Sequence, residues 1–357
     1  MVSALGIKAP VRLGQELDSE LQTRSKSDAV FWPEHGVQVE LPRWALSGER
    51  SVMKSFDGHP MLVTEWRVQN PRATVVLFQG RGESAFRWEE PARVFNRAGI
   101  DVVTLDWPGQ GLSGRFADGN AHHCDVRELV DHGRHFIETL AREGRLKGPV
   151  TVQGYSMGGC VAAALALDPP KAIDRIILHQ PMTGLHFDNI KGTVPECSRP
   201  LFNFVNVHQF IGLVGATVCL LGLSSNDSTV WETERYLARY FDHGPKLLMK
   251  DRWRLGRERN AARTHPAMNV ASPTWGFMRT SRQLMDRVRA RADEIKLKTL
   301  IISGEKDRVV CNRSHEEIHR EIEGSTHVVI PDGRHAVHHC EKPARRAYYD
   351  AVIPFIR

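Results

Sequence analysis

The sequence predicts an α/β fold in which a mostly parallel sheet carries helices on both faces. Apolar, strand-like runs alternate with helix-like segments along most of the chain, as they do where helical crossovers join parallel strands. The chain has 357 residues, of which 41% are hydrophobic, and this is enough to bury a full core. One long stretch breaks the alternation, so we expect a single domain with an insertion.

The expected elements follow one another toward the C-terminus. Strands are predicted at residues 74–79, 100–106, 150–154, 173–179, 299–303 and 326–330. Helices are predicted at residues 87–98, 125–143, 157–167, 313–323 and 342–356. Ahead of them, the segments around Asp57-Gly58 predict an antiparallel hairpin at one edge of the sheet.

Two segments lie outside this alternation. Residues 1–36 contain no continuous apolar run and no small-residue cleavage site, which argues against a secretory signal and predicts an N-terminal arm. Residues 37–184 and 295–357 are expected to form the core, with residues 185–294 inserted as a helical cap, because a crossover needs far fewer residues. Within the cap, the stretch 201–223 has 15 apolar residues in 23 and predicts a packed helical hairpin, an apolar surface for an acyl chain or lipid, or both.

The segment Gly154-Tyr155-Ser156-Met157-Gly158 carries the most chemical information. It follows the strand at 150–154 and opens the helix at 157–167, a context in which a tight turn holds a serine hydroxyl out of the chain. Glycines flank the turn because side chains there would crowd it. The start of the helix presents free N–H groups where an oxyanion would form. The sequence therefore predicts Ser156 as a nucleophile, with Tyr155 beside the substrate.

A serine nucleophile needs a base and an acid, and both follow strands later in the chain. Asp307 comes just after the strand at 299–303, and His335 just after the strand at 326–330. Both therefore belong to the edge of the sheet where Ser156 emerges. Their order in the chain, with the acid after the serine and the histidine last, is typical of a triad built on an α/β sheet.

Neighbouring residues offer alternatives for both partners. Glu305 and Asp332 are alternative acids, although both lie close to turn glycines. His338 and His339 are alternative bases, but they lie one helical turn further along, and His327 lies within its strand.

The loop Gln79-Gly80-Arg81-Gly82-Glu83-Ser84 follows the strand at 74–79. Its two glycines let the backbone approach a substrate carbonyl closely, so Gly80 is expected to adjoin the substrate. The N–H groups of Arg81 and Met157 are the predicted oxyanion donors. An ordinary strand-to-helix turn is the alternative interpretation of the loop.

These segments together resemble α/β-hydrolases of the group that contains monoacylglycerol lipases, bacterial lysophospholipases and serine aminopeptidases. The resemblance covers residues 50–357 and includes the turn Asp106–Arg115, similar to the family's D-x-x-G-x-G-x-S turn that braces the oxyanion loop. It implies the α/β-hydrolase fold, with an eight-stranded type of sheet and a helical cap. The Gly-Gln-Gly-x-Ser-Gly-Arg form of the turn is closer to the lysophospholipase branch. Gln79 departs from the pattern, because many relatives have a histidine there.

The same resemblance implies that the segment 272–278 returns from the cap to the active site. Trp275 is therefore expected to line an acyl pocket, and packing in the core accounts for this tryptophan equally well.

Positive charge is concentrated in one part of the chain. Residues 246–298 contain 14 Lys and Arg against 5 Asp and Glu, whereas the formal net charge of the whole chain is +6. A basic face beside an apolar cap predicts contact with an anionic membrane or a phosphate-bearing head group, and a solvated helical face is the alternative. No nucleic-acid-binding motif accompanies the charge, so no nucleic-acid partner is expected.

The six cysteines are scattered without C-x-x-C spacing, which predicts reduced thiols in a cytoplasmic protein, with peripheral membrane association as a further expectation. His122-His123-Cys124 and His338-His339-Cys340 are poor metal sites because adjacent ligands rarely point the same way. No metal or cofactor is expected.

The predicted activity is hydrolysis of a carboxylic ester through an acyl-enzyme on Ser156, with His335 as the base and Asp307 holding the imidazole tautomer. The favoured substrate is a lysophospholipid or a monoacylglycerol. A short-chain carboxylesterase or a serine aminopeptidase-like peptidase is the alternative, and a non-catalytic ligand-binding protein on the same scaffold is a distant one. The sequence carries no signal for the oligomeric state.

Overall fold

The computed structural model describes residues 29–32, 37–40, 48–114, 125–185, 248–264, 269–270 and 272–357. The chain divides into two compact units, Met1–Leu46 and Ser47–Arg357. In the first unit, the short strands β1 (Ala29–Trp32) and β2 (Val37–Glu40) pair in antiparallel fashion. The boundary between the units falls after Leu46, beyond the end of the predicted N-terminal arm.

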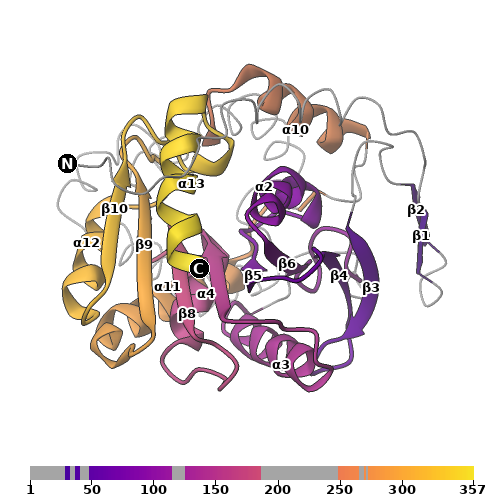
Figure 1. The fold of residues 1–357 in the computed structure, drawn as a ribbon, viewed down its shortest axis with the longest axis horizontal. Helices are drawn as coiled ribbons and strands as arrows, with labels where there is room; N and C mark the ends of the chain where they lie inside the picture. Colours follow the sequence, from indigo (N-terminus) through magenta and orange to yellow (C-terminus); the bar gives the residue numbers. More distant parts are fainter. Residues whose placement is uncertain are drawn as a thin grey trace, which may run out of the picture. The chain divides into compact units, whose positions relative to one another are not determined.

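The second unit is built on an eight-stranded sheet with the spatial order β10-β9-β8-β7-β5-β6-β4-β3 (Figure 1). Its strands are β3 (Glu49–Lys54), β4 (Pro60–Trp66), β5 (Ala73–Phe78), β6 (Ile100–Leu105), β7 (Val150–Tyr155), β8 (Arg175–His179), β9 (Lys298–Gly304) and β10 (Thr326–Ile330). The neighbours among β5 to β10 are parallel, whereas β4 is antiparallel to β6 and β3 is antiparallel to β4. The predicted parallel sheet is confirmed, and so is the hairpin that turns at Asp57-Gly58.

Every predicted strand is present to within two residues at each end. β5, β6 and β7 are buried along their full length, as expected for central strands with helices on both faces. Because consecutive parallel strands run the same way, the loops that follow β5, β7, β8, β9 and β10 meet at the carboxyl edge of the sheet.

Helices cover the sheet. They are α2 (Ala85–Arg97), α3 (Glu128–Arg142), α4 (Met157–Leu165), α10 (Arg252–Thr264), α11 (Trp275–Ala290), α12 (Asn312–Glu321) and α13 (Lys342–Ile356), with the short 3₁₀ helices η3 (Ala292–Glu294) and η4 (Val337–His339). The five predicted helices of the core correspond to α2, α3, α4, α12 and α13. None of the described helices is long and apolar enough to cross a bilayer.

Two neighbouring residues of β7 show that helices lie on both faces, because successive side chains of a strand point to opposite sides. Val152 belongs to the apolar cluster that also contains side chains of α3, α4 and α11. Gln153 points the other way and donates a hydrogen bond to the hydroxyl of Tyr348 on α13, with a distance of 2.6 Å. α2 lies beside α13 on that face, where the rings of Phe95 and Tyr349 pack edge to face.

Part of the range predicted as the cap packs on the core. α11 begins at residue 275, within the predicted cap of residues 185–294, yet it lies against α4, and four of its apolar side chains are buried in the same cluster: Phe277, Leu284, Met285 and Val288. Residues 186–247, which include the apolar stretch 201–223, lie outside the described residues.

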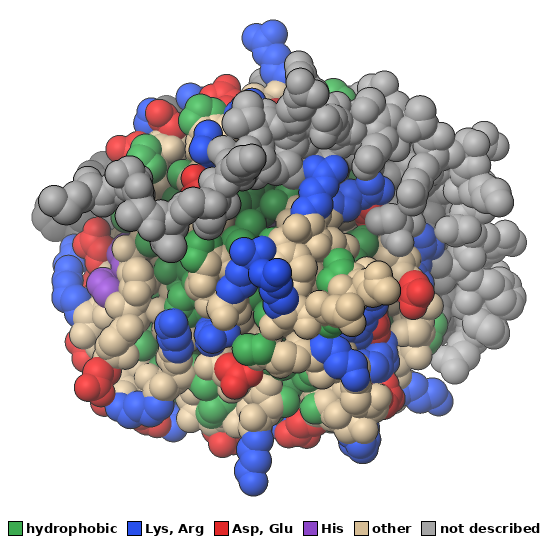
Figure 2. Space-filling model, in the orientation of Figure 1, with side chains coloured by type: hydrophobic (Ala, Val, Ile, Leu, Met, Phe, Trp, Pro, Cys, Tyr) green, Lys and Arg blue, Asp and Glu red, His purple; other side chains and the backbone are tan. Residues whose placement is uncertain are grey.

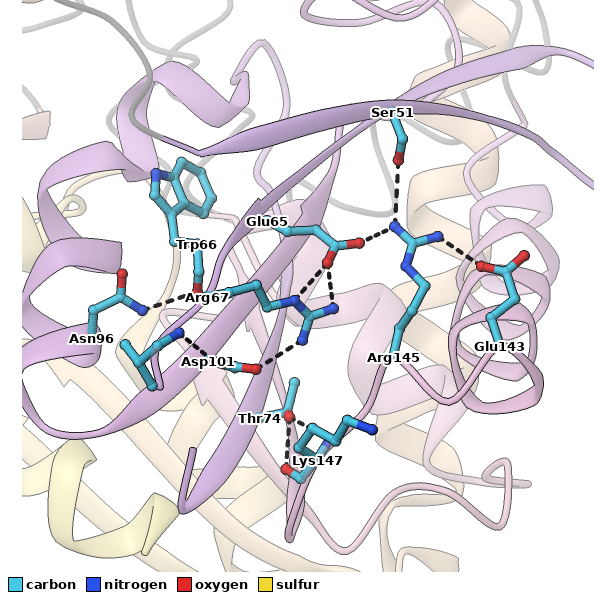
Figure 3. A network of polar contacts seen from close by, with 11 residues as sticks. Ser51, Glu65, Trp66, Arg67, Thr74, Asn96, Asp101, Glu143, Arg145 and Lys147 are labelled. Atoms are coloured by element: carbon cyan, nitrogen blue, oxygen red, sulfur yellow. Dashed lines mark hydrogen bonds and ion pairs between the residues drawn. The ribbon is translucent and has the colours of Figure 1, made fainter. Parts of the chain in front are cut away.

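A network of ion pairs lies at the amino edge of the parallel strands, as Figure 3 shows. Glu65, near the end of β4, lies between two arginines: Arg67 donates from Nε to Glu65 Oε2 at 2.6 Å, and Arg145 pairs with the other carboxylate oxygen. Arg67 Nη1 also lies 3.0 Å from Asp101 Oδ2 on β6. This network ties β4 to the loop after α3 and lies at the opposite edge from the candidate site.

Candidate active site

The turn between β7 and α4 holds Ser156 in a strained conformation. Its φ of 54° and ψ of −117° lie in a region that residues other than glycine seldom adopt. The backbone N–H of Ser156 donates to the carbonyl of His179 at 3.0 Å, which ties the turn to the end of β8. A Cβ added at Gly158 would lie 2.2 Å from the carbonyl oxygen of Phe78, so only glycine fits behind the serine. The expectation that the turn needs small residues therefore has a specific steric cause.

Ser156, His335 and Asp307 form a continuous chain of hydrogen bonds. His335 Nε2 lies 2.9 Å from Ser156 Oγ, and His335 Nδ1 lies 2.8 Å from Asp307 Oδ2. Asp307 and His335 are buried, whereas Ser156 is partly exposed. Because a carboxylate can only accept, Nδ1 carries the proton and Nε2 is left to accept the serine hydroxyl. This arrangement can take a proton from Ser156 and stabilise the imidazolium that results.

The carboxylate of Asp307 is held at both oxygens. Oδ1 accepts the backbone N–H groups of Val309 and Val310 at 2.7 and 3.1 Å. Oδ2 accepts His335 and also the side-chain amide of Gln180, at 3.1 Å. Burial alone would raise the pKa of Asp307, but the adjacent His335 and the backbone N–H groups of Val309 and Val310 lower it below its ordinary value, so the group stays ionised.

The alternative acids are engaged with each other on the surface. Asp332 pairs with Lys306, and its N–H donates to the carboxylate of Glu305 at 2.9 Å. Among the described residues, Asp307 is the carboxylate that forms a hydrogen bond with His335.

The alternative bases have other surroundings. His338 is stacked on Trp88, with ring centroids 4.5 Å apart, and His339 Nε2 lies 2.9 Å from the carbonyl of Arg87. His327 Nε2 lies 2.8 Å from the hydroxyl of Ser303. Of the four histidines named as candidate bases, His335 is the one that forms a hydrogen bond with Ser156.

The loop after β5 lies directly against the serine turn. A Cβ added at Gly80 would lie 3.0 Å from the Tyr155 ring and 3.3 Å from Ser156 Cβ. Glu83 Oε2 accepts the backbone N–H of Gly80 at 3.0 Å and the indole N–H of Trp88 at 3.2 Å. Glu83 is buried, and the sequence predicted no role for its carboxylate.

The two predicted oxyanion donors belong to segments that meet at this point. Arg81 follows Gly80 in the loop, and its guanidinium lies over the Phe277 ring, 5.3 Å from the centroid. Met157 is the first residue of α4, so its N–H has no acceptor within the helix.

Gln79 bridges the loop to the turn after β6. Its amide Nε2 donates to Thr104 Oγ1 at 3.0 Å and to Asp106 Oδ1 at 2.9 Å. Trp107 Nε1 in turn donates to the backbone carbonyl of Gln79 at 2.9 Å. A Cβ added at Gly111 would lie 2.2 Å from Asp106 Oδ2, so this turn closes tightly around the carboxylate. A glutamine therefore supplies the bracing contacts at the position where many relatives have histidine.

Tyr155 and Trp275, the other predicted substrate contacts, have different surroundings. The Tyr155 side chain is only 2% exposed, and its ring packs on the imidazole of His335, with centroids 5.1 Å apart. Trp275 is partly exposed at the start of α11, where Thr274 caps the helix by accepting the Phe277 N–H at 3.1 Å. A role in substrate binding stays a prediction for both.

The described residues include no group of three or more His, Cys, Asp and Glu side chains arranged to hold a metal ion. His122-His123-Cys124 lies outside the described ranges. His338 and Cys340 are buried in the protein interior, and Cys160, Cys311 and Cys340 are free thiols.

The basic segment at the start of α10 anchors the chain to the core through Arg254, which belongs to the range predicted as a basic face. Its side chain is 4% exposed. Nε donates to Glu90 Oε2 on α2 at 2.9 Å, and Nη1 donates to Asp251 Oδ2 at 2.6 Å. The same segment reaches the site loop, because the N–H of Ala336 donates to the carbonyl of Leu248 at 2.9 Å.

Comparison with known proteins agrees with this geometry. The family model described as serine aminopeptidase, S33, matches residues 69–342. Lysophospholipase L2 of Escherichia coli (strain K12) is 26% identical over 309 residues, which are 84% of each chain. Monoglyceride lipase of Rattus norvegicus is 27% identical over 176 residues, 49% of this chain and 55% of that protein.

Solved structures show the same fold. The crystal structure of a soluble variant of monoglyceride lipase from Saccharomyces cerevisiae has a TM-score of 0.65 at 17% identity, and the match covers 87% of this chain and 94% of that one. The predicted α/β-hydrolase fold is therefore confirmed. Because the family model spans well over half of the chain, the protein belongs to the serine aminopeptidase S33 family of hydrolases.

Proposed function

We propose that the protein hydrolyses the carboxylic ester of a lipid with a single acyl chain, with Ser156 as nucleophile, His335 as general base and acid, and Asp307 as the group that orients the imidazole. The observation that carries the proposal is the continuous hydrogen-bonded chain from Ser156 Oγ to Asp307 beside the glycine loop. Serine, imidazole and carboxylate in this order are the groups that acyl transfer requires.

In the acylation step, Ser156 Oγ attacks the ester carbonyl carbon while its proton passes to His335 Nε2. The negative charge that develops on the carbonyl oxygen is accepted by the N–H groups of Arg81 and Met157. The tetrahedral intermediate then collapses, and His335 gives its proton to the departing alcohol oxygen, which leaves the acyl group on Ser156.

Deacylation repeats these steps with water. His335 removes a proton from the water as its oxygen attacks the acyl carbonyl, and the intermediate expels Ser156 Oγ, which takes the proton back. The products are a fatty acid and the free enzyme. The steps use groups of this chain and one water molecule, so the proposal includes no metal or cofactor.

A lysophospholipid is the favoured substrate over a monoacylglycerol. The similarity to lysophospholipase L2 extends over 84% of this chain, whereas the similarity to the rat monoglyceride lipase extends over 49%. The turn Asp106–Arg115 supports the same branch through its Gly-Gln-Gly-x-Ser-Gly-Arg form.

We further propose peripheral contact with an anionic membrane. Trp253 on α10 is 40% exposed and follows the exposed Lys250 and Arg252 in the chain, whereas Arg254 is buried in ion pairs and adds nothing to the surface. On the face drawn in Figure 2, Lys and Arg side chains lie beside hydrophobic ones. Aromatic and basic side chains together suit a lipid interface with anionic head groups.

Co-sedimentation with vesicles tests the membrane contact. Vesicles that contain phosphatidylglycerol should bind more protein than phosphatidylcholine vesicles. Salt at 0.5 M should weaken the binding, because the electrostatic screening length falls to roughly 3–5 Å at that ionic strength. Binding that does not depend on the content of anionic lipid would contradict the electrostatic part of the proposal.

A cytoplasmic location is likewise proposed from the free thiols, and cell fractionation tests it.

Hydrolysis of p-nitrophenyl esters from C2 to C16, beside lysophosphatidylcholine and monoolein, tests the activity itself. Long-chain preference and release of fatty acid from the lysophospholipid are expected, and Ser156→Ala should fall below a tenth of wild-type activity while the protein stays folded. Activity confined to C2–C4 esters would identify a small-ester hydrolase instead. Cleavage of aminoacyl amides with the esters untouched would identify a peptidase, and absence of all turnover would leave the ligand-binding alternative.

A further inference from the structure

Gln180 follows β8 at the carboxyl edge of the sheet and has an unusual environment. Its φ is 45°, in the left-handed region that a glutamine seldom adopts, and its side chain is fully buried. Its backbone N–H donates to the carbonyl of Ile302 on β9 at 2.8 Å. A long polar side chain on a strained backbone in the core persists only where surrounding contacts hold it there.

The side-chain amide of Gln180 connects two loops of the site. Nε2 lies 3.1 Å from Asp307 Oδ2 in the loop after β9 and 2.6 Å from the carbonyl oxygen of Arg334 in the loop after β10. Carboxylate and carbonyl oxygens only accept hydrogen bonds, so the chemistry of both partners requires that the NH₂ end of the amide face them. The two N–H groups are therefore used one for each loop.

The end of β9 leaves space for this amide. A Cβ added at Gly304 would lie 2.6 Å from Gln180 Nε2 and 2.7 Å from the carbonyl oxygen of Arg334. Any larger residue at Gly304 would displace the amide from between its two acceptors.

We propose that Gln180 is a positioning residue that holds the Asp307 carboxylate and the peptide group before His335 in place. The inference rests on the proposed function of Ser156, His335 and Asp307. Val309 and Val310 hold one carboxylate oxygen, and Gln180 and His335 hold the other, so the carboxylate cannot rotate away from the imidazole.

A neutral donor suits this position better than a charged one. A lysine or arginine at residue 180 would cancel part of the negative charge with which Asp307 stabilises the imidazolium. A glutamate would set a second carboxylate against Asp307. The amide orients Asp307 and leaves its charge in place.

Gln180→Leu and Gln180→Gly test the inference as a pair. Leucine keeps most of the volume at a strained backbone, whereas glycine relieves the backbone, and both lose the amide. Both variants are expected to lower kcat about tenfold with KM nearly unchanged, because one hydrogen bond to a charged group is lost. The acid limb of kcat/KM is expected to move as well, because the lost donor acts on the carboxylate that faces the imidazole.

Asn70→Leu and Asn70→Gly form the matched control. Asn70 also has a left-handed backbone, with φ of 54°, but it is exposed and lies before β5 at the amino edge of the sheet. These variants should change the unfolding midpoint and leave kcat and the acid limb unchanged. If Gln180→Leu lowers kcat and Gln180→Gly does not, backbone strain is the cause and the inference is wrong.

The low-field proton resonance of His335 Nδ1–H gives a measurement that does not depend on turnover. It is expected to shift in both Gln180 variants and in neither Asn70 variant. If the wild type hydrolyses no ester, the proposed function fails, and the resonance still tests the contact. A resonance, kcat and acid limb that are all unchanged in both Gln180 variants would overturn the inference.

Discussion

Ser156 is held by its backbone as well as by its hydroxyl. The N–H of Ser156 donates to the carbonyl of His179, and its own carbonyl accepts the N–H of Met182 at 2.8 Å. These two bonds fix the turn to the segment after β8, so the left-handed conformation persists without any help from a ligand. The hydroxyl is thereby presented to His335 in the resting protein.

Glu83 supports the loop after β5, which carries the proposed oxyanion donor Arg81, through contacts of a single side chain. We expect Glu83→Gln to lower kcat/KM about tenfold, because the new NH₂ would face an N–H donor where the carboxylate accepts Gly80, Trp88 and Arg87. Displacement of Gly80 would then move the N–H of Arg81 away from the substrate carbonyl. Steady-state kinetics with a p-nitrophenyl ester measures the loss, and circular dichroism checks the fold.

Glu89→Gln is the matched control for that variant. Glu89 lies on α2, just after the loop that contains Glu83. It is also buried, and it accepts the indole N–H of Trp66 and the guanidinium of Arg93, both at 2.8 Å. The Glu89→Gln variant should have a lower free energy of unfolding than the wild type and the same kcat/KM. Equal losses of kcat/KM in the two variants would show that α2 as a whole, and not Glu83, governs the effect.

The positions of Ser156, Asp307 and His335 at one edge could be predicted because each lies in the turn or loop that follows a strand, and parallel strands end at a common edge. Gln180 also follows a strand, but its role depends on which acceptors lie within reach of a long side chain. Glu83 could not be separated from Glu89 or Glu90 in the sequence for the same reason. Residue type and spacing predict the edge, whereas hydrogen-bond partners depend on packing.

At the scale of elements, α10 is joined to α2 through a buried ion pair. Arg254 and Glu90 are both less than 7% exposed in their side chains, and Asp251 completes the contact. Breaking such a pair leaves a buried charge without a partner, which costs about 3–5 kcal/mol, whereas removing both charges costs much less. The pair therefore fixes how the returning chain meets the core.

We expect Arg254→Met to lower the free energy of unfolding by about 3–5 kcal/mol and the double variant Arg254→Met/Glu90→Gln to recover part of that loss. Urea unfolding at pH 7.5 measures both. Arg254→Met should also lower kcat/KM, because Leu248 in the same segment accepts the N–H of Ala336 beside His335. A double variant no more stable than the single one would contradict the explanation.

Glu65→Gln provides the control at the opposite edge of the sheet. It weakens the contacts of Glu65 with Arg67 and Arg145, which join β4 to the loop after α3 (Figure 3). Stability should fall while kcat/KM is retained. A loss of kcat/KM as large as that of Arg254→Met would mean that lower stability alone explains the kinetics.

Strand and helix positions could be predicted from the sequence because apolar periodicity reports directly on burial, as for β5 and α4. The position of α11 and the burial of Arg254 could not be predicted in this way. α11 follows a long insertion, so its place in the chain indicated the cap, although its apolar side chains pack on α4. A count of charges between residues 246 and 298 likewise cannot separate exposed arginines from one that is paired inside.

At the scale of the whole molecule, several histidines are buried and neutral. Burial lowers the pKa of His132 and of His315 to about 4, and that of His179 to about 3, from an ordinary value near 6.5. Both ring nitrogens of His315 have hydrogen-bond partners. Nδ1 lies 2.7 Å from Ser303 Oγ, and Nε2 lies 2.8 Å from the carbonyl oxygen of Pro181. The unfolded chain binds protons at these groups at a higher pH than the folded protein does.

The free energy of unfolding should therefore be highest above pH 6.5 and should decrease as the pH drops from 6.5 toward 4, because the unfolded state then binds more protons than the folded state. Each such group contributes up to about 1.4 kcal/mol per pH unit to the loss. Urea unfolding at pH 7.5, 6.0 and 5.0 measures it. His179→Phe removes one titrating group whose ring nitrogens have no hydrogen-bond partner among the described residues, so its stability should fall less steeply. The same slope in wild type and variant would exclude His179 as a source of the pH dependence.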